Sequence, residues 1–465
     1  MKISWDEMIM LAASCLLLIA LAWQYPASTT FPIGGDAATY ITHVRTILNH
    51  PTQTFNILRG SWYPTMYAIL SPAALIPFID WPARFTLYMA LGQIATGLAI
   101  GWLCYRLNGV KSAAFGIALW ALTPVILTPF YEDGTLAQLW SLPFFILFFE
   151  RLLANSPWGI LITLMLVTTT HPISGVVLLI TIAIASPSLW RIRTHLFAPE
   201  KKFINIILII SSSIFVLFCG LLIFHYKTFT IAYPPEHSSY TQELYHGFFA
   251  SWVALAVIGY LAMVNKLKSK PQNLILIGSL IFATLLLAFN DYAGVGFWTR
   301  RLTPYLVIVT IAGAAYILPK LCNQVLVKNW LTVTVFIVLF ASLGISVWNE
   351  NAPRYRFYEA PGNYGRLLLG EEASILWLKN NVPPNSHIYS TIANRNTEWI
   401  PALTLLTWIP FEPDPVQQIK NHQDQAHSYV VYFKQREKVP PQYLNDPSHY
   451  KIIYQNNSAI ILQPL

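Results

Sequence analysis

Charge is scarce in this chain of 465 residues: 11% of them are Asp, Glu, Lys or Arg, whereas 55% are hydrophobic. Ordinary globular proteins carry about 25% charged residues. So little charge cannot cover the surface of a soluble protein of this length. The composition therefore excludes a soluble enzyme.

Cysteine is also scarce, and its placement excludes two further classes. The sequence has four cysteines and no Cys-x-x-Cys pair, and each cysteine lies inside an apolar run. Neither a disulfide framework nor a zinc site is expected from this pattern. The four residues are Cys15, Cys104, Cys219 and Cys322.

The charges that are present divide the chain into two parts. Residues 1–348 hold 19 Lys/Arg and 11 Asp/Glu, while residues 349–465 hold ten of each. This contrast predicts a transmembrane domain over 1–348 and a soluble domain over 349–465. The basic residues lie in short connections between apolar runs, so the sequence pI near 9.1 does not indicate nucleic-acid binding.

Long apolar runs fill the first part, and a membrane span needs about 20 such residues. Because many runs follow the first one, we expect that run to be a retained anchor rather than a cleaved signal peptide. Nine spans are clear from length alone: 8–25, 83–105, 112–129, 135–153, 203–225, 248–265, 272–290, 302–319 and 330–348.

Two further segments need the distribution of basic residues to interpret them. Segment 65–79 has 15 residues, about 22 Å as a helix, and segment 158–189 is too long for one span and contains His171-Pro172. If 65–79 only dips into the outer leaflet and 158–189 forms two spans, 13 basic residues lie inside and 6 outside; the opposite choice leaves 11 and 8. The positive-inside rule favours the first arrangement. We therefore predict about eleven transmembrane helices in a multi-pass plasma-membrane protein, with a cytoplasmic N-terminus and an extracytoplasmic C-terminal domain.

The C-terminal domain reads as a small α/β module. Residues 371–380 are predicted to form a helix that ends before Pro383-Pro384. Residues 386–390 and 429–433 are predicted strands, and 450–463 a hairpin around Asn456-Asn457.

The first outer loop, residues 26–82, carries the first candidate for chemistry. Two glycines precede Asp36, and a helix starting there places Asp36, Tyr40 and His43 on one face. One alternative is that Asp36 is an N-cap that accepts backbone N–H bonds. The other is that its carboxylate is a general base.

A second acidic site, Glu132-Asp133, lies in a short turn between two spans. It is either a solvated turn or a functional site, and the predicted topology places it on the same membrane face as Asp36. A charge at the centre of a membrane helix costs about 2.5 to 3.5 kcal/mol, so acids at span ends are expected where water or a polar substrate lies. The two sites together predict a general base with either an orienting partner or a divalent metal held by Asp36 and Asp133.

Basic and polar residues mark two more positions. Arg300-Arg301 precedes the 302–319 span, where the pair either reaches lipid headgroups or binds phosphate with its guanidinium forks. His171 follows three threonines and needs a polar partner, in a structural role or in a substrate cavity.

The order of these motifs resembles the GT-C superfamily, polytopic glycosyltransferases that use polyprenyl-phosphate-linked sugars. The resemblance rests on Gly34-Gly35-Asp36 after the first span, on Trp62-Tyr63-Pro64 before a semi-buried segment, and on the acidic turn after 112–129. It covers about 300 residues in organisation. The Trp-Trp-Asp signature of oligosaccharyltransferases is absent, which argues against that activity.

The arginine site adds to the resemblance. Arg301 followed by Pro304 is similar to the Arg-Tyr-x-x-Pro pattern of the mannosyltransferase-like branch. Leu302 replaces the tyrosine, and the proline comes one position early.

The resemblance implies an inverting sugar transfer on the outer membrane face. Asp36 would take the proton from an acceptor hydroxyl, and Glu132 or Asp133 would orient the acceptor or hold Mg²⁺ or Mn²⁺. Arg301, with Arg300, would stabilise the departing lipid phosphate. The donor would be a polyprenyl-phosphate-linked sugar, and the acceptor a glycan, a lipid or a protein. The implied substrate cavity is lined by Tyr40, His43, Tyr63 and His171. Two short helices on either side of His171, about 14 residues or 21 Å each, would leave a cavity that lipid can reach.

A function of another class is the alternative. The chain would then be a lipid-linked glycan transporter, or a scaffold that carries an exported binding domain. Transporters commonly consist of paired repeats with broken helices. No corresponding halves occur in this sequence.

Overall fold

A computed structural model describes most of the chain. The described residues are 3–29, 32, 36–60, 63–123, 130–131, 134–154, 156–191, 248–268, 270–289, 299–326, 329–357, 367–384, 386–391, 398–411, 427–435 and 447–465. Their contacts form two compact units. The helical unit comprises Met1–Gln24, Ala90–Pro129 and Ala137–Asn349, and the mixed unit comprises Tyr25–Met89, Phe130–Leu136 and Glu350–Leu465.

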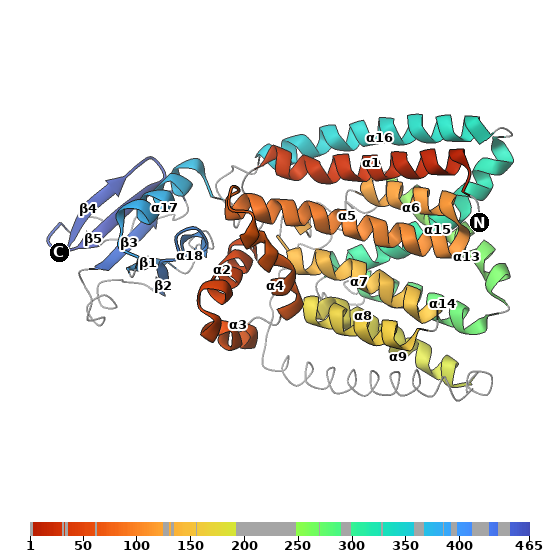
Figure 1. Cartoon of the computed structure of the whole chain (residues 1–465), viewed down its shortest axis with the longest axis horizontal. Helices are drawn as coiled ribbons and strands as arrows, with labels where there is room; N and C mark the ends of the chain where they lie inside the picture. The colour runs from red at the N-terminus through yellow and green to blue at the C-terminus, as the bar shows by residue number, and fades with distance from the viewer. Residues whose placement is uncertain are drawn as a thin grey trace. The chain divides into compact units, whose positions relative to one another are not determined.

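Long apolar helices make up the helical unit, as the hydropathy predicts (Figure 1). Six of the described helices are long and apolar enough to cross a membrane, and four shorter apolar helices accompany them. The chain is therefore a polytopic helical membrane protein. The helices are α1 (Trp5–Ser28), α5 (Trp81–Asn108), α6 (Val110–Ala121), α7 (Leu136–Leu153), α8 (Pro157–Thr170), α9 (Pro172–Arg191), α13 (Phe248–Leu267), α14 (Pro271–Ala288), α15 (Thr299–Val325) and α16 (Asn329–Phe357).

Ten of the eleven predicted spans coincide with described helices, six of which are long and apolar enough to cross a membrane. The predicted span 203–225 lies outside the described residues, so the count of eleven stays a prediction. The break at His171 is present, because this residue is extended (φ −155°, ψ 120°) between α8 and α9. We expected a short helix of about 14 residues on each side. This length holds for α8, whereas α9 has 20 residues.

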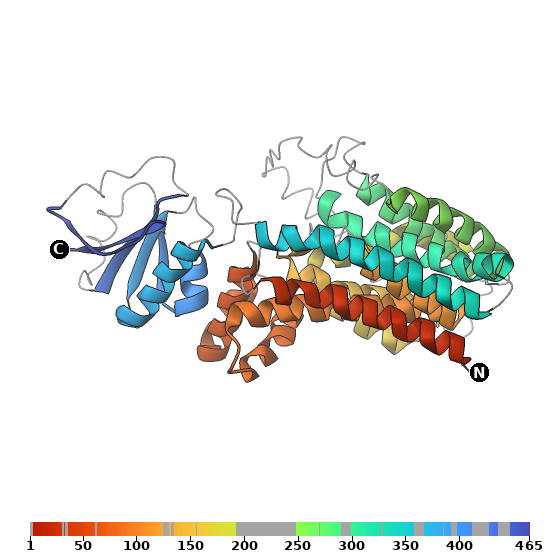
Figure 2. The same cartoon turned by 90° about the horizontal axis from the view of Figure 1, so that it is seen from above.

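Close backbone contacts hold the helical unit together. A Cβ atom on Gly259 of α13 would lie 1.9 Å from the carbonyl oxygen of Gly313 on α15, so these two helices touch where both residues lack a side chain. Helices α1 and α16 run side by side in both views (Figures 1 and 2), and the Gln24 amide donates to the Trp348 carbonyl at 2.6 Å. Small residues and shared hydrogen bonds therefore replace the hydrophobic effect that drives packing in water.

In the mixed unit, the first loop forms short helices rather than a span. They are α2 (Asp36–Asn49), η1 (Pro51–Gln53), α3 (Thr54–Gly60), α4 (Pro64–Leu70) and η2 (Ser71–Leu75). Helix α4 has seven residues, about 10 Å of rise, and cannot cross a membrane. Leu75 and Phe78 are more than 80% exposed, as expected for a segment that inserts apolar side chains into a leaflet.

The rest of the mixed unit is an α/β module with a five-stranded sheet. Its elements are α17 (Leu369–Asn381), β1 (His387–Thr391), α18 (Trp399–Thr404), β2 (Thr407–Phe411), β3 (Ser428–Phe433), β4 (Tyr450–Gln455) and β5 (Ala459–Pro464). The strand order is β2-β1-β3-β5-β4, with β1 parallel to β2 and β3, and β5 antiparallel to β3 and β4. The predicted helix, two strands and hairpin are all present.

Two elements of this module were not predicted. Strand β2 contains Pro410, which lacks a backbone N–H and argues against a central strand. It is tolerated because β2 is an edge strand. Helix α18 has six residues, too few for a clear periodic pattern.

Candidate functional site

Helix α2 presents Asp36 at its N-terminus. The apolar residues Ala37, Ile41 and Val44 are fully buried and hold α2 in the mixed unit. Asp36 lies in the first turn of the helix, and its side chain is half-buried. The positive end of the helix dipole favours a carboxylate in this first turn.

Aromatic rings surround the next turn of α2. The Tyr40 side chain is 5% exposed, and its ring centroid lies 5.7 Å from that of Tyr63, 6.5 Å from Tyr67 and 6.3 Å from Phe85. These contacts bring together Tyr40 and Tyr63, two predicted cavity residues. Tyr67 and Phe85 were not predicted, although Tyr67 follows Tyr63 by four residues and so lies on the same helical face.

His43 belongs to the same cluster. Its Nδ1 lies 2.8 Å from the Tyr67 hydroxyl, and the two rings meet edge-on. Burial lowers the pKa of His43, so the imidazole is neutral at pH 7. A neutral imidazole has one donor and one acceptor nitrogen. It can therefore hold the tyrosine hydroxyl in one orientation without adding positive charge near Asp36.

The C-terminal module is joined to the helix that carries Asp36. The Thr39 hydroxyl donates to the Glu398 carboxylate at 2.8 Å, next to α18, and the Arg45 guanidinium donates to the Ala402 carbonyl. Burial, with repulsion from Arg84, lowers the pKa of Arg45 to about 10, so it stays charged at pH 7. These contacts require the first loop and the C-terminal module to lie on one side of the membrane.

The acidic turn, Glu132-Asp133, is flanked on both sides by residues whose positions are defined. Phe130 and Tyr131 are buried, and the Tyr131 ring lies 4.3 Å from that of Tyr25. Gly134 has a φ of +69°, which favours glycine, and Thr135 is buried. Glu132 and Asp133 themselves lie outside the described residues. The residues on either side of them belong to the mixed unit, as Asp36 does.

A polar network occupies the helical unit near Arg301. The Arg301 guanidinium interacts electrostatically with the buried imidazole of His171. These two predicted site residues are thus brought together, whereas His171 lies in a different unit from Tyr40 and His43. The side chain of Arg300 is outside the described set.

Hydrogen bonds connect three helices around this arginine. The Arg301 carbonyl accepts a bond from the Gln138 amide of α7, and the Ser174 hydroxyl of α9 lies 2.5 Å from the Tyr305 hydroxyl of α15. Ser141 on α7 bonds to Ser174 as well. These four side chains could not be predicted from the sequence, because single polar residues in apolar spans carry no pattern. They hold the start of α15, and with it Arg301, in place.

The described residues contain no group of three or more His, Cys, Asp or Glu side chains that could hold a metal ion. Of the two predicted metal ligands, Asp36 is described and Asp133 is not. The predicted metal site therefore stays a prediction.

Comparisons with known proteins were made at the level of sequence and of structure. No protein-family model and no curated protein sequence matches the chain. Solved structures do match. The oligosaccharyltransferase AglB from Archaeoglobus fulgidus, in complex with an inhibitory peptide and a dolichol-phosphate, has a TM-score of 0.55 at 13% identity over 92% of this chain and 70% of its own.

Two further structures match. The A. fulgidus oligosaccharyltransferase in complex with Zn and sulfate has a TM-score of 0.52 at 13% identity, covering 91% of this chain and 68% of its own. ArnT from Cupriavidus metallidurans in the apo state has a TM-score of 0.51 at 11% identity, covering 96% of this chain and 97% of its own. AglB and ArnT are both members of the GT-C superfamily. The fold of this chain is therefore similar to that of two GT-C superfamily members, as the resemblance in the sequence led us to expect.

Proposed function

We propose that the protein is an inverting glycosyltransferase that moves a sugar from a polyprenyl-phosphate carrier to an acceptor on the outer face of the plasma membrane. The acceptor is a glycan, a lipid or a protein, and the transferred group is a hexose. The observation that carries the proposal is that Asp36 and the residues flanking Glu132-Asp133 belong to one compact unit.

Asp36 is the proposed general base. The acceptor hydroxyl attacks the anomeric carbon of the donor sugar, the bond from that carbon to the lipid phosphate breaks, and Asp36 accepts the hydroxyl proton. A base of this kind contributes about 10² to 10⁴ in rate. The position of Asp36 beside the aromatic cluster of Tyr40, His43 and Tyr63 supports this role, because rings of this kind form the apolar walls of ligand sites.

Glu132 or Asp133 is the proposed partner of the base. Either carboxylate would accept hydrogen bonds from the acceptor and orient it. Asp36 and Asp133 would also supply oxygen ligands for Mg²⁺ or Mn²⁺, which would act as a Lewis acid on the phosphate. One of the solved structures to which this chain is similar, the A. fulgidus oligosaccharyltransferase, was crystallised with Zn.

Arg301, with Arg300, is the proposed ligand of the donor phosphate. Negative charge grows on this phosphate as the sugar leaves, and a guanidinium fork stabilises it with two hydrogen bonds. The hydrogen bond from the Gln138 amide to the Arg301 carbonyl supports a preorganised arginine. AglB, whose fold this chain shares, has been solved with a dolichol-phosphate.

The C-terminal module, residues 349–465, is proposed as an accessory domain that helps to bind the acceptor. The contacts of α18 with α2 support this role, since they link the module to the helix that begins at Asp36.

A transfer assay tests the proposal. Purified protein in lipid nanodiscs, incubated with radiolabelled polyprenyl-phosphate hexose and an outer-membrane or cell-wall glycan fraction, is expected to move label from the organic phase to the acceptor. The released polyprenyl phosphate should rise in equal amount. Donor that crosses the membrane of proteoliposomes unchanged, with no transfer, would instead establish the transporter alternative.

The proposed topology predicts a labelling pattern. In a chain whose four cysteines are replaced by alanine, a cysteine at the exposed positions Thr52 or Lys379 should react with an impermeant maleimide added to intact cells. A cysteine at exposed Lys268 should react only after the membrane is permeabilised. Labelling of position 268 in intact cells, with protection of 52 and 379, would invert the proposed orientation.

A further inference from the structure

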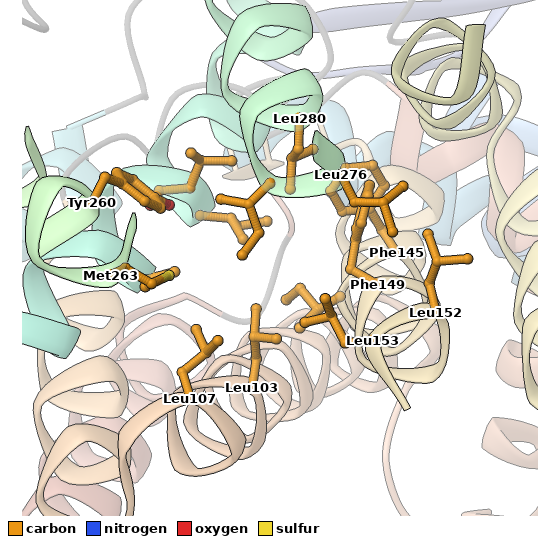
Figure 3. A pocket seen from close by; sticks show the side chains of 15 residues that line it. Leu103, Leu107, Phe145, Phe149, Leu152, Leu153, Tyr260, Met263, Leu276 and Leu280 are labelled. Carbon is orange, nitrogen blue, oxygen red and sulfur yellow. The ribbon is translucent and has the colours of Figure 1, made fainter. Parts of the chain in front are cut away.

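An apolar pocket lies between helices of the helical unit (Figure 3). Side chains from α5, α7, α13, α14 and α15 line it, among them Leu107, Phe149, Tyr260, Met263, Leu280 and Val309. The one hydroxyl in this set is satisfied, because Tyr260 donates to the Val309 carbonyl at 2.6 Å. The wall therefore offers carbon and sulfur surface, which suits a hydrocarbon chain rather than a sugar.

The pocket lies beside the middle of α15. Ile308, Val309 and Ala312 line it from this helix, 7 to 11 residues from Arg301, which is about 10 to 16 Å at 1.5 Å per residue. The neighbouring surface of α13 and α14 is apolar and open, since Leu261 is 64% and Phe282 58% exposed. In a membrane these side chains face lipid, so the pocket adjoins the bilayer.

Two lysines stand at the rim of the pocket. The Lys266 ammonium donates to the carbonyl of Leu107, a lining residue, at 2.8 Å. It also lies 5.8 Å from the centroid of the Tyr316 ring, and the Lys320 ammonium lies 4.5 Å from the same ring. The two ammonium groups therefore lie near the same aromatic ring, that of Tyr316.

The positive charge at this rim is not balanced by nearby carboxylates. Arg106 and Arg151 both pair with Glu150, at 3.3 Å. Within the described part of the chain, neither Lys266 nor Lys320 has a carboxylate within 4.0 Å. Like charges held together without a counterion favour an anion between them.

We propose that the pocket binds one acyl chain of an anionic glycerophospholipid, whose phosphate is held by Lys266 and Lys320. The apolar wall accommodates the chain and the two ammonium groups accommodate the headgroup. Basic clusters beside transmembrane helices bind anionic lipids in this way. The headgroup site is separate from the proposed donor phosphate site, because Lys320 lies 19 residues from Arg301 along α15, about 28 Å at 1.5 Å per residue.

Lipid titration of the purified full-length protein tests this site. Native mass spectrometry with phosphatidylglycerol and with phosphatidylcholine of identical chains should show a preference for the anionic lipid. Lys266→Gln should weaken phosphatidylglycerol binding about five-fold, since each basic residue near a membrane surface contributes roughly that factor. Lys266→Gln with Lys320→Gln should weaken it about 25-fold. Phosphatidylcholine binding should change little.

Matched variants separate the pocket from the general membrane surface. Lys270→Gln changes an exposed lysine of the α13–α14 connection and should leave phosphatidylglycerol affinity unchanged. Met263→Trp fills the pocket and should abolish binding, whereas Leu261→Trp, on the lipid-facing side of the same helix, should not. Thermal melting in detergent would verify that each variant is folded.

Three outcomes would overturn the proposal. They are equal affinity for the two phospholipids, unchanged phosphatidylglycerol affinity in the double lysine variant, and one-for-one displacement of phosphatidylglycerol by polyprenyl phosphate. The last outcome would assign the pocket to the isoprenoid chain of the donor.

Discussion

Asp36→Asn is expected to lower sugar transfer by about 10² to 10⁴, the contribution of a general base. Asparagine is close in size and supports a helix start about as well as aspartate, but its amide cannot take the acceptor proton. Asp36 is the first residue of α2, so loss of its charge should change the free energy of unfolding by no more than about 1 kcal/mol. Initial rates of label transfer and thermal melting of the same preparation measure the two effects.

Asp80→Asn is the matched control for this substitution. Asp80 also stands at a helix start, directly before α5, and its side chain is exposed. It should retain wild-type transfer. Asp133→Asn should be impaired, more mildly than Asp36→Asn if this residue orients the acceptor. If the Asp36→Asn variant retains more than about a tenth of wild-type transfer, Asp36 is not the general base. Its role is then to support the start of its helix.

Arg301→Lys is expected to weaken donor binding about 10- to 100-fold, while the Michaelis constant for the acceptor changes little. Lysine keeps the charge but loses the two-pronged hydrogen bond, and a hydrogen bond to a charged group contributes about 1.5 to 3 kcal/mol. The backbone contact from Gln138 to the Arg301 carbonyl does not depend on the side chain, so α15 should keep its position. Michaelis constants for donor and acceptor, measured separately, test this prediction.

Arg106→Lys serves as the control for the arginine substitution. Arg106 is paired with Glu150 near the far end of α5 and has no proposed role in donor binding. It should leave both constants unchanged. Equal weakening of donor and acceptor by Arg301→Lys would mean that the residue supports the fold of the region rather than the donor phosphate.

Hydropathy predicted most of the helical unit, because a membrane span must be long and apolar wherever it occurs. The predicted span 83–105 is α5, and 330–348 lies within α16. The break at His171-Pro172 was also predicted, because proline restricts the residue before it and ends the α8 pattern. The full length of α9 was not predicted, because the estimate of 14 residues assumed that both helices beside His171 were short.

The composition and order of the sequence alone determined that this is a polytopic membrane protein. They also predicted a C-terminal α/β module and an order of polar motifs that resembles the GT-C superfamily. These properties depend on local runs of residues. Tertiary structure alone decided three sets of contacts. They are the hydrogen bond of Thr39 with Glu398, the aromatic cluster around Tyr40, and the contact of Lys266 with Leu107 at the rim of the pocket. Such contacts join residues that are 23 to more than 350 positions apart, and no local pattern in one sequence specifies which distant surfaces meet.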